Sequence, residues 1–215
     1  MNPKLTRWHK EVITTEAENA IKALRRKNLL SRFYLAGGTA LALHFGHRKS
    51  ADLDFFSQQP FNEEELLRNV QRLRKFLLVA KDRETLHTHI KGMKVSFLGY
   101  GYPLLFPLES FLGIQIADPR DIACMKISAI AGRGTRRDFV DLFVASQQYG
   151  LAHLMEAFKA KFASAHYNLI HVLKSLTFFE DAEKEPMPHM LIDLSWPEVK
   201  QLFTREVPRL LSHLK

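Results

Sequence analysis

The fold is decided by the stretch FYLAGGTALALHFGHRKSADLDFF, which runs from Phe33 to Phe56. A short apolar run ends at a glycine pair, an apolar and helix-like segment follows, and a second apolar run carries two aspartates. Successive side chains of a strand point to opposite faces, so Asp52 and Asp54 are expected to share one face while Leu53 points to the core. The stretch therefore predicts a strand, a helix and a second strand that carries two acids on one side.

The acids and the glycine pair together predict a site for a metal ion and a phosphate. Neighbouring carboxylates repel each other unless a cation lies between them, and Mg²⁺ takes one or two carboxylates together with substrate phosphates. A glycine turn that enters a helix presents backbone N–H groups to a phosphate. The candidate nucleotide-binding residues are therefore Gly37, Gly38 and Thr39, and Arg48 either joins them or only covers the loop.

A second group of candidate residues lies in the other half of the chain. Asp118 and Pro119 are expected to begin a helix, in which Lys126 stands among residues that favour burial. Its ammonium group must therefore reach solvent or meet an anion. Asp138 and Asp141 share one face of the next expected helix. The alternative is a surface lysine with a first-turn aspartate that only stabilises the helix N-terminus.

Taken together, the two groups resemble the AbiEii/AbiGii toxin family of nucleotidyltransferases, which belongs to the polymerase-beta-type superfamily. The resemblance covers roughly residues 34–142, and its second half rests on Lys126, Ala129, Arg133, Arg137, Asp138, Asp141 and Leu142. It implies a nucleotidyltransferase-like fold, a nucleoside triphosphate substrate and the role of toxin in a toxin–antitoxin or phage-defence pair, with a cognate antitoxin as partner. Some relatives extend the 3′ end of transfer RNA, so RNA is the expected acceptor.

The resemblance also implies roles for the candidate residues. Asp52 and Asp54 are expected to hold Mg²⁺ or Mn²⁺, and Lys126 to neutralise charge on the pyrophosphate leaving group. Asp138 is expected to act as a base, as a support for the metal or as a partner that orients Lys126. Supporting roles are expected for two further residues, Arg137 and Asp141.

One position departs from the superfamily pattern, which usually has a third carboxylate on a later strand facing the acid pair. The candidate strand, residues 93–98, carries Ser96 there and no acid. Either Asp138 serves instead, or one ion is enough, or the chain is a degenerate nucleotide binder that acts through a partner. An enzyme that nucleotidylates proteins and a kinase-like enzyme are further alternatives. His87 and His89 share a strand face, but without a third ligand they do not predict a zinc site.

Composition sets only broad limits on function. Hydrophobic residues make up 46% and charged residues 25% of the 215 residues, as in ordinary globular proteins. The net charge of +8 permits a polyanionic partner such as RNA without requiring one. The single cysteine, Cys124, excludes an internal disulfide and is expected to be buried. No apolar run has the length of a membrane span and the N-terminus shows no signal-peptide pattern, so a cytoplasmic protein without a membrane partner is expected.

The remaining patterns predict an α/β (α+β) protein in two parts. Residues 1–117 are expected to form a small mixed sheet flanked by helices, and residues 118–215 a helical domain that contributes Lys126 and Asp138 to the site. The expected strands are residues 32–36, 51–57, 76–81, 85–90, 94–98 and 114–117. The expected helices are residues 10–28, 39–45, 62–75, 118–131, 135 onward, 151–162, 167–178 and 196–215. Residues 180–188 read as an acidic connection, and Pro208 is expected to bend or interrupt the last helix.

Overall fold

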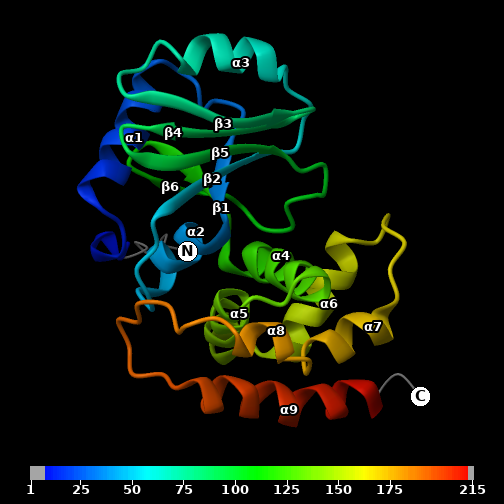
Figure 1. Cartoon of the computed structure of the whole chain (residues 1–215). Coiled ribbons are helices and arrows are strands. Elements are labelled where there is room, and N and C mark those ends of the chain that lie inside the picture. The colour runs from blue at the N-terminus through cyan, green and yellow to red at the C-terminus, as the bar shows by residue number, and fades with distance from the viewer. Residues whose placement is uncertain (1–7, 213–215) are drawn as a thin grey trace, which may run out of the picture. The chain divides into compact units, whose positions relative to one another are not determined.

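The computed structural model describes residues 8–212, and the chain divides into two compact units, Met1–Asp118 and Pro119–Lys215. In the described part of the first unit, seven strands form one sheet in the order β3-β4-β5-β2-β1-β7-β6 (Figure 1). The strands are β1 Tyr34–Ala36, β2 Asp52–Ser57, β3 Phe76–Asp82, β4 Thr85–Ile90, β5 Met93–Gly99, β6 Glu109–Phe111 and β7 Ile114–Ile116. The expected mixed α/β fold is confirmed.

The sheet is mixed because two of its neighbouring pairs are parallel. Strand β2 runs parallel to β5 and antiparallel to β1, and β1 runs parallel to β7. The hairpin partners β3 with β4, β4 with β5 and β6 with β7 are antiparallel. The central strand β2 is therefore flanked by β1, which leads into the glycine turn, and by β5, which carries Ser96.

The core of the first unit lies against one face of this sheet. Leu53 and Phe55 of β2 are fully buried, and the Phe55 ring stacks on Phe97 of β5 with ring centroids 5.8 Å apart. Helix α1, Thr15–Arg26, packs against β5 with its apolar side, which comprises Ala17, Ala20, Ile21 and Leu24. The alternation predicted for β2 is confirmed, so its acids lie on the face opposite this core.

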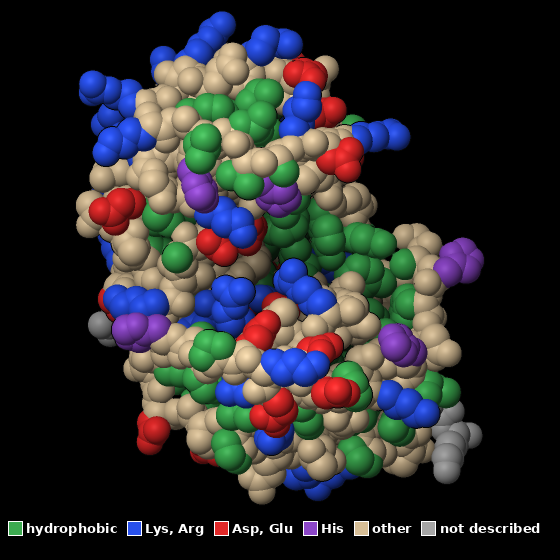
Figure 2. Space-filling model, in the orientation of Figure 1, with side chains coloured by type: hydrophobic (Ala, Val, Ile, Leu, Met, Phe, Trp, Pro, Cys, Tyr) green, Lys and Arg blue, Asp and Glu red, His purple; other side chains and the backbone are tan. Residues whose placement is uncertain are grey.

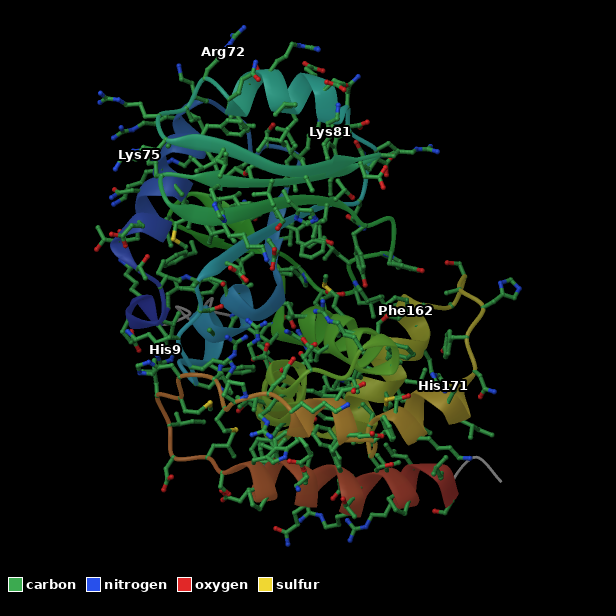
Figure 3. The ribbon with its side chains drawn as sticks, viewed as in Figure 1. His9, Arg72, Lys75, Lys81, Phe162 and His171 are labelled. Carbon is green, nitrogen blue, oxygen red and sulfur yellow. The ribbon has the colours of Figure 1, made fainter. Side chains whose placement is uncertain are left out.

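Helix α3, Glu63–Val70, covers β3 and β4 (Figure 1). Its N-cap is Asn62, whose side chain accepts a hydrogen bond from the Glu65 N–H. From β3, the Lys81 side chain reaches toward this helix (Figure 3) and pairs with Glu64. The helix ends at Val70, before the residue 75 expected from the sequence.

The second unit is helical, as predicted. Its helices are α4 Pro119–Gly132, α5 Arg136–Tyr149, α6 Leu151–Lys161, α7 Leu169–Ser175, α8 Glu180–Glu183 and α9 Trp196–Ser212. Helix α4 packs against α5, α6 and α7. Around Phe139 of α5 lie the rings of Phe179, Trp196 and Phe203. A buried ion pair joins α6 to α4, with Lys161 Nζ 2.7 Å from Asp121 Oδ1.

Several boundaries differ from the sequence-based prediction. The first expected helix is interrupted: a 3₁₀ turn, η1 Lys10–Val12, precedes α1, whose N-cap is Thr14. The sequence patterns missed the three-residue strand β6 and the four-residue helix α8, which are too short for a periodic signal. Residues 1–7, which include most of the segment searched for a signal peptide, and residues 213–215 of the last expected helix lie outside the described part.

Pro208 does not interrupt the last helix. Helix α9 continues through it to Ser212, and Pro208 lies on the exposed side. A carbonyl group that loses its N–H partner to proline can be hydrated there, which lowers the cost of the missing hydrogen bond. None of the helices within residues 8–212 has both the length and the apolar character needed to cross a membrane.

Candidate functional site

Strand β2 places Asp52 and Asp54 on one face of the sheet. Both are half-buried, and Leu53 between them is fully buried on the other face. In the parallel pairing with β5, Asp52 lies opposite Lys94 and Asp54 lies opposite Ser96. Lys94 Nζ is 3.9 Å from Asp52 Oδ2, but both side chains are well exposed, so this pair contributes little to stability. The face therefore holds two carboxylates and one lysine side by side.

The glycine turn lies directly against the second of these acids. Helix α2, Gly37–Phe45, begins at the turn, two residues earlier than expected, and Gly37 has a φ of +70°. A Cβ atom on Gly37 would stand 3.3 Å from Asp54 Oδ2. The left-handed conformation favours glycine, and a Cβ here would crowd the Asp54 carboxylate. The N-cap of α2 is Ala36, whose side chain makes no capping hydrogen bond.

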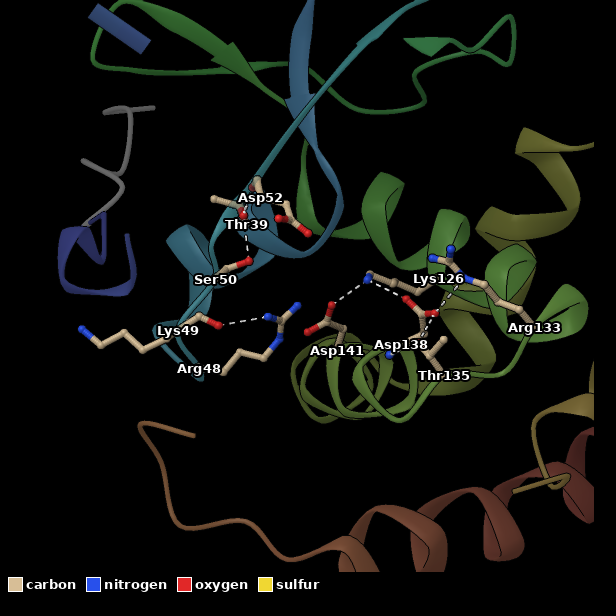
Figure 4. A network of polar contacts seen from close by, with 10 residues as sticks. All are labelled: Thr39, Arg48, Lys49, Ser50, Asp52, Lys126, Arg133, Thr135, Asp138 and Asp141. Atoms are coloured by element: carbon tan, nitrogen blue, oxygen red, sulfur yellow. Dashed lines mark hydrogen bonds and ion pairs between the residues drawn. The ribbon is translucent and has the colours of Figure 1, made fainter. Parts of the chain in front are cut away.

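Thr39 joins α2 to the acidic strand. Its hydroxyl contacts the backbone carbonyl of Asp52 and the hydroxyl of Ser50, the latter at 2.7 Å (Figure 4). The threonine side chain is buried and holds the start of β2 against α2. Arg48 is also buried, and its Nη1 donates to the Lys49 carbonyl at 3.1 Å. Gly37, Asp52, Asp54 and Thr39 are thus gathered around one turn.

In the second unit, Lys126 lies between two buried carboxylates. Its Nζ is 2.8 Å from Asp138 Oδ1 and 2.7 Å from Asp141 Oδ2 (Figure 4). The side chains of Lys126, Asp138 and Asp141 are exposed by 11%, 3% and 0%. We call these three residues the lysine cluster. Of the two alternatives open from the sequence, an anionic partner and a surface position, the structure shows the former.

Two further groups bind Asp138. The Thr135 hydroxyl donates to Asp138 Oδ2 at 2.5 Å, and Arg133 Nε lies 3.5 Å from the same oxygen. Thr135 is also the N-cap of α5 and accepts from the Asp138 N–H. Both carboxylate oxygens of Asp138 therefore have partners within the second unit. Arg137 is exposed and is not part of the cluster.

Lys126 and Asp138 are both held in their charged forms at neutral pH. Burial disfavours the ammonium group of Lys126, but the carboxylates of Asp141 and Asp138 outweigh it and hold the lysine pKa above its usual value. Burial likewise opposes the Asp138 carboxylate, yet Lys126, Thr135 and Arg133 hold its pKa below the usual value. Among the three roles considered for Asp138, these contacts match that of a partner that orients Lys126.

The sequence did not reveal one contact beside the acids. His87 Nδ1 of β4 lies 3.1 Å from Ser96 Oγ of β5, which places an imidazole next to the position where an acid was expected. The signal was present in the alternation of two adjacent strands, since β4 and β5 form a tight hairpin that pairs these residues. Within residues 8–212, no group of three or more His, Cys, Asp or Glu side chains is arranged to hold a metal ion.

Comparisons with known proteins agree with this description. The profile of the family described as nucleotidyl transferase AbiEii toxin, type IV toxin–antitoxin system, matches residues 20–105 and 102–213. An uncharacterised protein of Aquifex aeolicus (strain VF5) is 38% identical over 204 residues, which cover 92% of this chain and 97% of that protein.

Solved structures similar to the chain include the following two, of which the first has the same fold. The antibiotic-resistance factor ANT(2″)-Ia is 13% identical, with a TM-score of 0.52 over 70% of this chain and 95% of that one. MenT4, a nucleotidyltransferase toxin of Mycobacterium tuberculosis H37Rv, is 15% identical, with a TM-score of 0.49 over 90% of this chain and 84% of that one. With the family profile spanning both units, the chain belongs to the AbiEii family of nucleotidyl transferase toxins.

Proposed function

We propose that this toxin transfers a nucleotide from a nucleoside triphosphate to a hydroxyl group of RNA, including the 3′ end of transfer RNA. The observation that carries the proposal is the juxtaposition of two carboxylates and a glycine turn. Asp52 and Asp54 share one strand face, and a Cβ on Gly37 would stand 3.3 Å from Asp54 Oδ2. A triphosphate at this corner meets acids that can share a cation with it and backbone N–H groups that can donate to it.

The donor set is compatible with Mg²⁺ or Mn²⁺. Both side chains offer oxygen ligands only, and both are partly exposed, as is needed at a site where Mg²⁺ also keeps phosphate oxygens and water in its coordination shell. Such an ion, when bound, supplies positive charge that stabilises the phosphate and the attacking oxygen. The protein's part is to present two carboxylates at a fixed spacing on a buried strand, with Thr39 holding the start of that strand in place.

The transfer itself is a displacement at the α-phosphorus. An oxygen of the acceptor hydroxyl bonds to that phosphorus, the bond to the bridging oxygen of the β-phosphate breaks, and pyrophosphate leaves. From the family resemblance, Lys126 is proposed to counter the charge of the leaving group; its ammonium group lies between Asp138 and Asp141 and is charged. Asp138 and Asp141 support that role by fixing the lysine side chain.

Label transfer tests this proposal directly. The purified chain is incubated with cellular RNA and each triphosphate labelled at the α or the γ position, with Mg²⁺, Mn²⁺ or a chelator. We expect α-label in RNA, dependent on the metal and lost in Asp52→Asn, Asp54→Asn and Lys126→Ala. The matched control is Asp82→Asn, which removes an exposed carboxylate from β3 of the same sheet and is expected to leave transfer unchanged.

Other outcomes identify the alternatives. Transfer of γ-label alone indicates a kinase-like enzyme, and α-label in protein indicates protein nucleotidylation. Nucleotide binding without any transfer indicates a degenerate binder, which the serine at position 96 would then explain.

The toxin role is tested in cells, where expression of the chain is expected to arrest growth and Asp54→Asn to relieve the arrest. Co-expression of a protein encoded by the neighbouring reading frame is expected to do the same if that protein is the antitoxin. Plating efficiency of phage on cells that carry the pair tests a part in phage defence. Triphosphates and RNA are cytoplasmic, so we propose that the toxin acts there.

A further inference from the structure

A row of polar side chains continues from the acid pair across the same face of the sheet. Ser96 of β5 lies opposite Asp54, and His87 of β4 lies opposite Ser96. Two contacts show that these side chains share one face: Lys94 Nζ approaches Asp52, and His87 Nδ1 approaches Ser96 Oγ. Figure 2 shows histidine side chains beside basic and acidic ones at the level of these strands.

The contact with Ser96 fixes the orientation of the His87 ring. Ser96 is only 1% exposed, so its hydroxyl needs a partner inside the protein, and His87 Nδ1 supplies one at 3.1 Å. His87 itself is half-buried, and its Nε2 has no hydrogen-bond partner among the residues that the structure describes. When Nδ1–H donates to Ser96 Oγ, Nε2 carries the lone pair and is able to accept a proton.

The distance from His87 to the acid pair leaves room for an acceptor hydroxyl. Adjacent strands lie about 4.8 Å apart, so the Cα atoms of His87 and Asp54 are roughly 10 Å apart, with Ser96 between them. An imidazole that extends over Ser96 closes part of this distance. A hydroxyl group that approaches a phosphate held at Asp52 and Asp54 can therefore meet the ring from the same side.

Other groups are less suited to accept that proton. Asp52 and Asp54 are occupied if they share a cation with the triphosphate, and the position opposite Asp54 holds a hydroxyl in place of an acid. Within the second unit, both oxygens of Asp138 are bound by Lys126, Thr135 and Arg133. Histidine is the side chain most often used as a general base, and Nε2 of His87 has no hydrogen-bond partner among the residues that the structure describes.

We propose that His87, oriented by Ser96, is the general base that accepts the proton of the acceptor hydroxyl. As the oxygen bonds to the α-phosphorus and pyrophosphate leaves, the hydroxyl proton passes to Nε2 of His87. His87 is thus a catalytic residue and Ser96 is a positioning residue. The assignment rests on the proposed function, because it concerns the acceptor side of the same transfer. The charged groups and the second histidine that the strand register places on the same sheet face are Asp52, Asp54, Asp82, His89 and Lys94.

The chain offers a matched control two residues along β4. His89 lies on the same face and is exposed, but it lies opposite Lys94 and is not hydrogen-bonded to Ser96. With α-labelled triphosphate and saturating acceptor, we expect His87→Gln to lower kcat by about 10²–10⁴-fold, as for loss of a general base. The Kd of the triphosphate, measured by titration, is expected to stay within about twofold of wild type, since the base contacts the acceptor. His89→Gln is expected to change neither quantity.

Two further measurements separate catalysis from folding. The acidic limb of the wild-type pH profile for kcat is expected to disappear in His87→Gln and to persist in His89→Gln. Free imidazole is expected to restore part of the rate to His87→Ala and none of it to a variant without Asp54. Ser96→Ala is expected to lose less activity than His87→Gln, because the ring remains but is no longer held.

Nitrogen NMR of the histidine rings tests the geometry without any turnover. The His87 signals are identified by their loss in His87→Gln. We expect wild-type His87 to carry its proton on Nδ1, and Ser96→Ala to shift the tautomer mixture toward Nε2–H. A wild-type ring protonated on Nε2 at neutral pH would overturn the assignment, as would equal tautomer populations in wild type and Ser96→Ala.

The activity measurements give equally clear refutations. Transfer by His87→Gln at the wild-type rate, with the same pH profile, removes His87 from the reaction and leaves the proposed transfer standing. A loss of triphosphate affinity in proportion to the loss of rate makes His87 a nucleotide-binding residue and overturns its role as base. Absence of transfer by the wild-type chain overturns both the proposed function and this assignment.

Discussion

Removal of the Lys126 ammonium group is expected to destabilise the second unit, by an amount that depends on pH. The ammonium group lies 2.8 Å from Asp138 and 2.7 Å from Asp141, and the three side chains are almost fully buried. Lys126→Met keeps the length of the side chain but leaves two carboxylates without their cation. Breaking a buried ion pair in this way costs about 3–5 kcal/mol, and we expect a loss of this size at pH 7.

The sign of the pH dependence follows from the pKa of the acids. In the wild type, the pKa of Asp138 is lowered by folding, so its contribution to stability is present above the unfolded pKa and is lost as pH falls through the folded value. In Lys126→Met, burial acts without the lysine, so folding raises the pKa of the two acids and their contribution is lost as pH rises. The stability difference between wild type and variant is therefore small near pH 4 and grows toward pH 7.

Unfolding in urea measures the difference in free energy of unfolding between wild type and Lys126→Met, provided that the signal comes from the second unit alone. The chain has two tryptophans, and Trp196 packs on Phe139 within the second unit. With Trp8→Phe as the background, tryptophan fluorescence reports on the second unit alone. The matched control is Lys159→Met, which breaks an exposed pair with Glu156 and is expected to cost much less. A loss in Lys126→Met no larger than in this control, or one that is constant between pH 4 and 7, would refute the reasoning.

Three further predictions follow from single contacts. Gly37→Ala is expected to weaken metal-dependent triphosphate binding, measured by titration calorimetry, because its Cβ would stand 3.3 Å from Asp54 Oδ2. The control is Gly92→Ala, since Gly92 also has a positive φ but open space around its Cα. Equal effects of the two substitutions on triphosphate binding would contradict this cause. Asp54→Asn is expected to melt no lower than wild type without metal, since it removes like-charge repulsion, and a clearly lower Tm by calorimetry would make the carboxylate structural. Cys124 is buried, and its pKa is raised to about 12, chiefly by burial. A thiol reagent at pH 8 is therefore expected to label Cys124 only after unfolding, and prompt labelling of the native chain would contradict its burial.

Local patterns were enough to predict much of the fold. The alternation of β2 and the glycine turn into α2 each depend on a few neighbouring residues, and each is present in the structure. The elements that were missed are short: β6 has three residues and α8 has four, so neither spans enough positions for a periodic pattern. Pro208 does not interrupt α9, because the cost of a proline within a helix depends on exposure, which the sequence does not state.

The sequence predicted which residues are candidates for the site, but it did not predict which residues they contact. The sequence placed a lysine in an apolar helix, but both an anionic partner and a path to solvent were open. Packing of α5 against α4 decided the matter, because it brings Asp138 and Asp141 to within 3 Å of the ammonium group. In the same way, the sequence showed only that Ser96 occupies a position where a third carboxylate was expected. The pairing of β4 with β5 in the structure places His87 beside this serine.

The sequence by itself determined the two acids on one strand face, the glycine turn and the helical second half, because these follow from periodicities of two and 3.6 residues and from backbone conformations that only certain residues adopt. Tertiary structure alone decided which charges neutralise Lys126 and which imidazole stands next to Ser96. Such contacts join residues from different elements, and their distances are set by strand register and helix packing, which no local pattern contains.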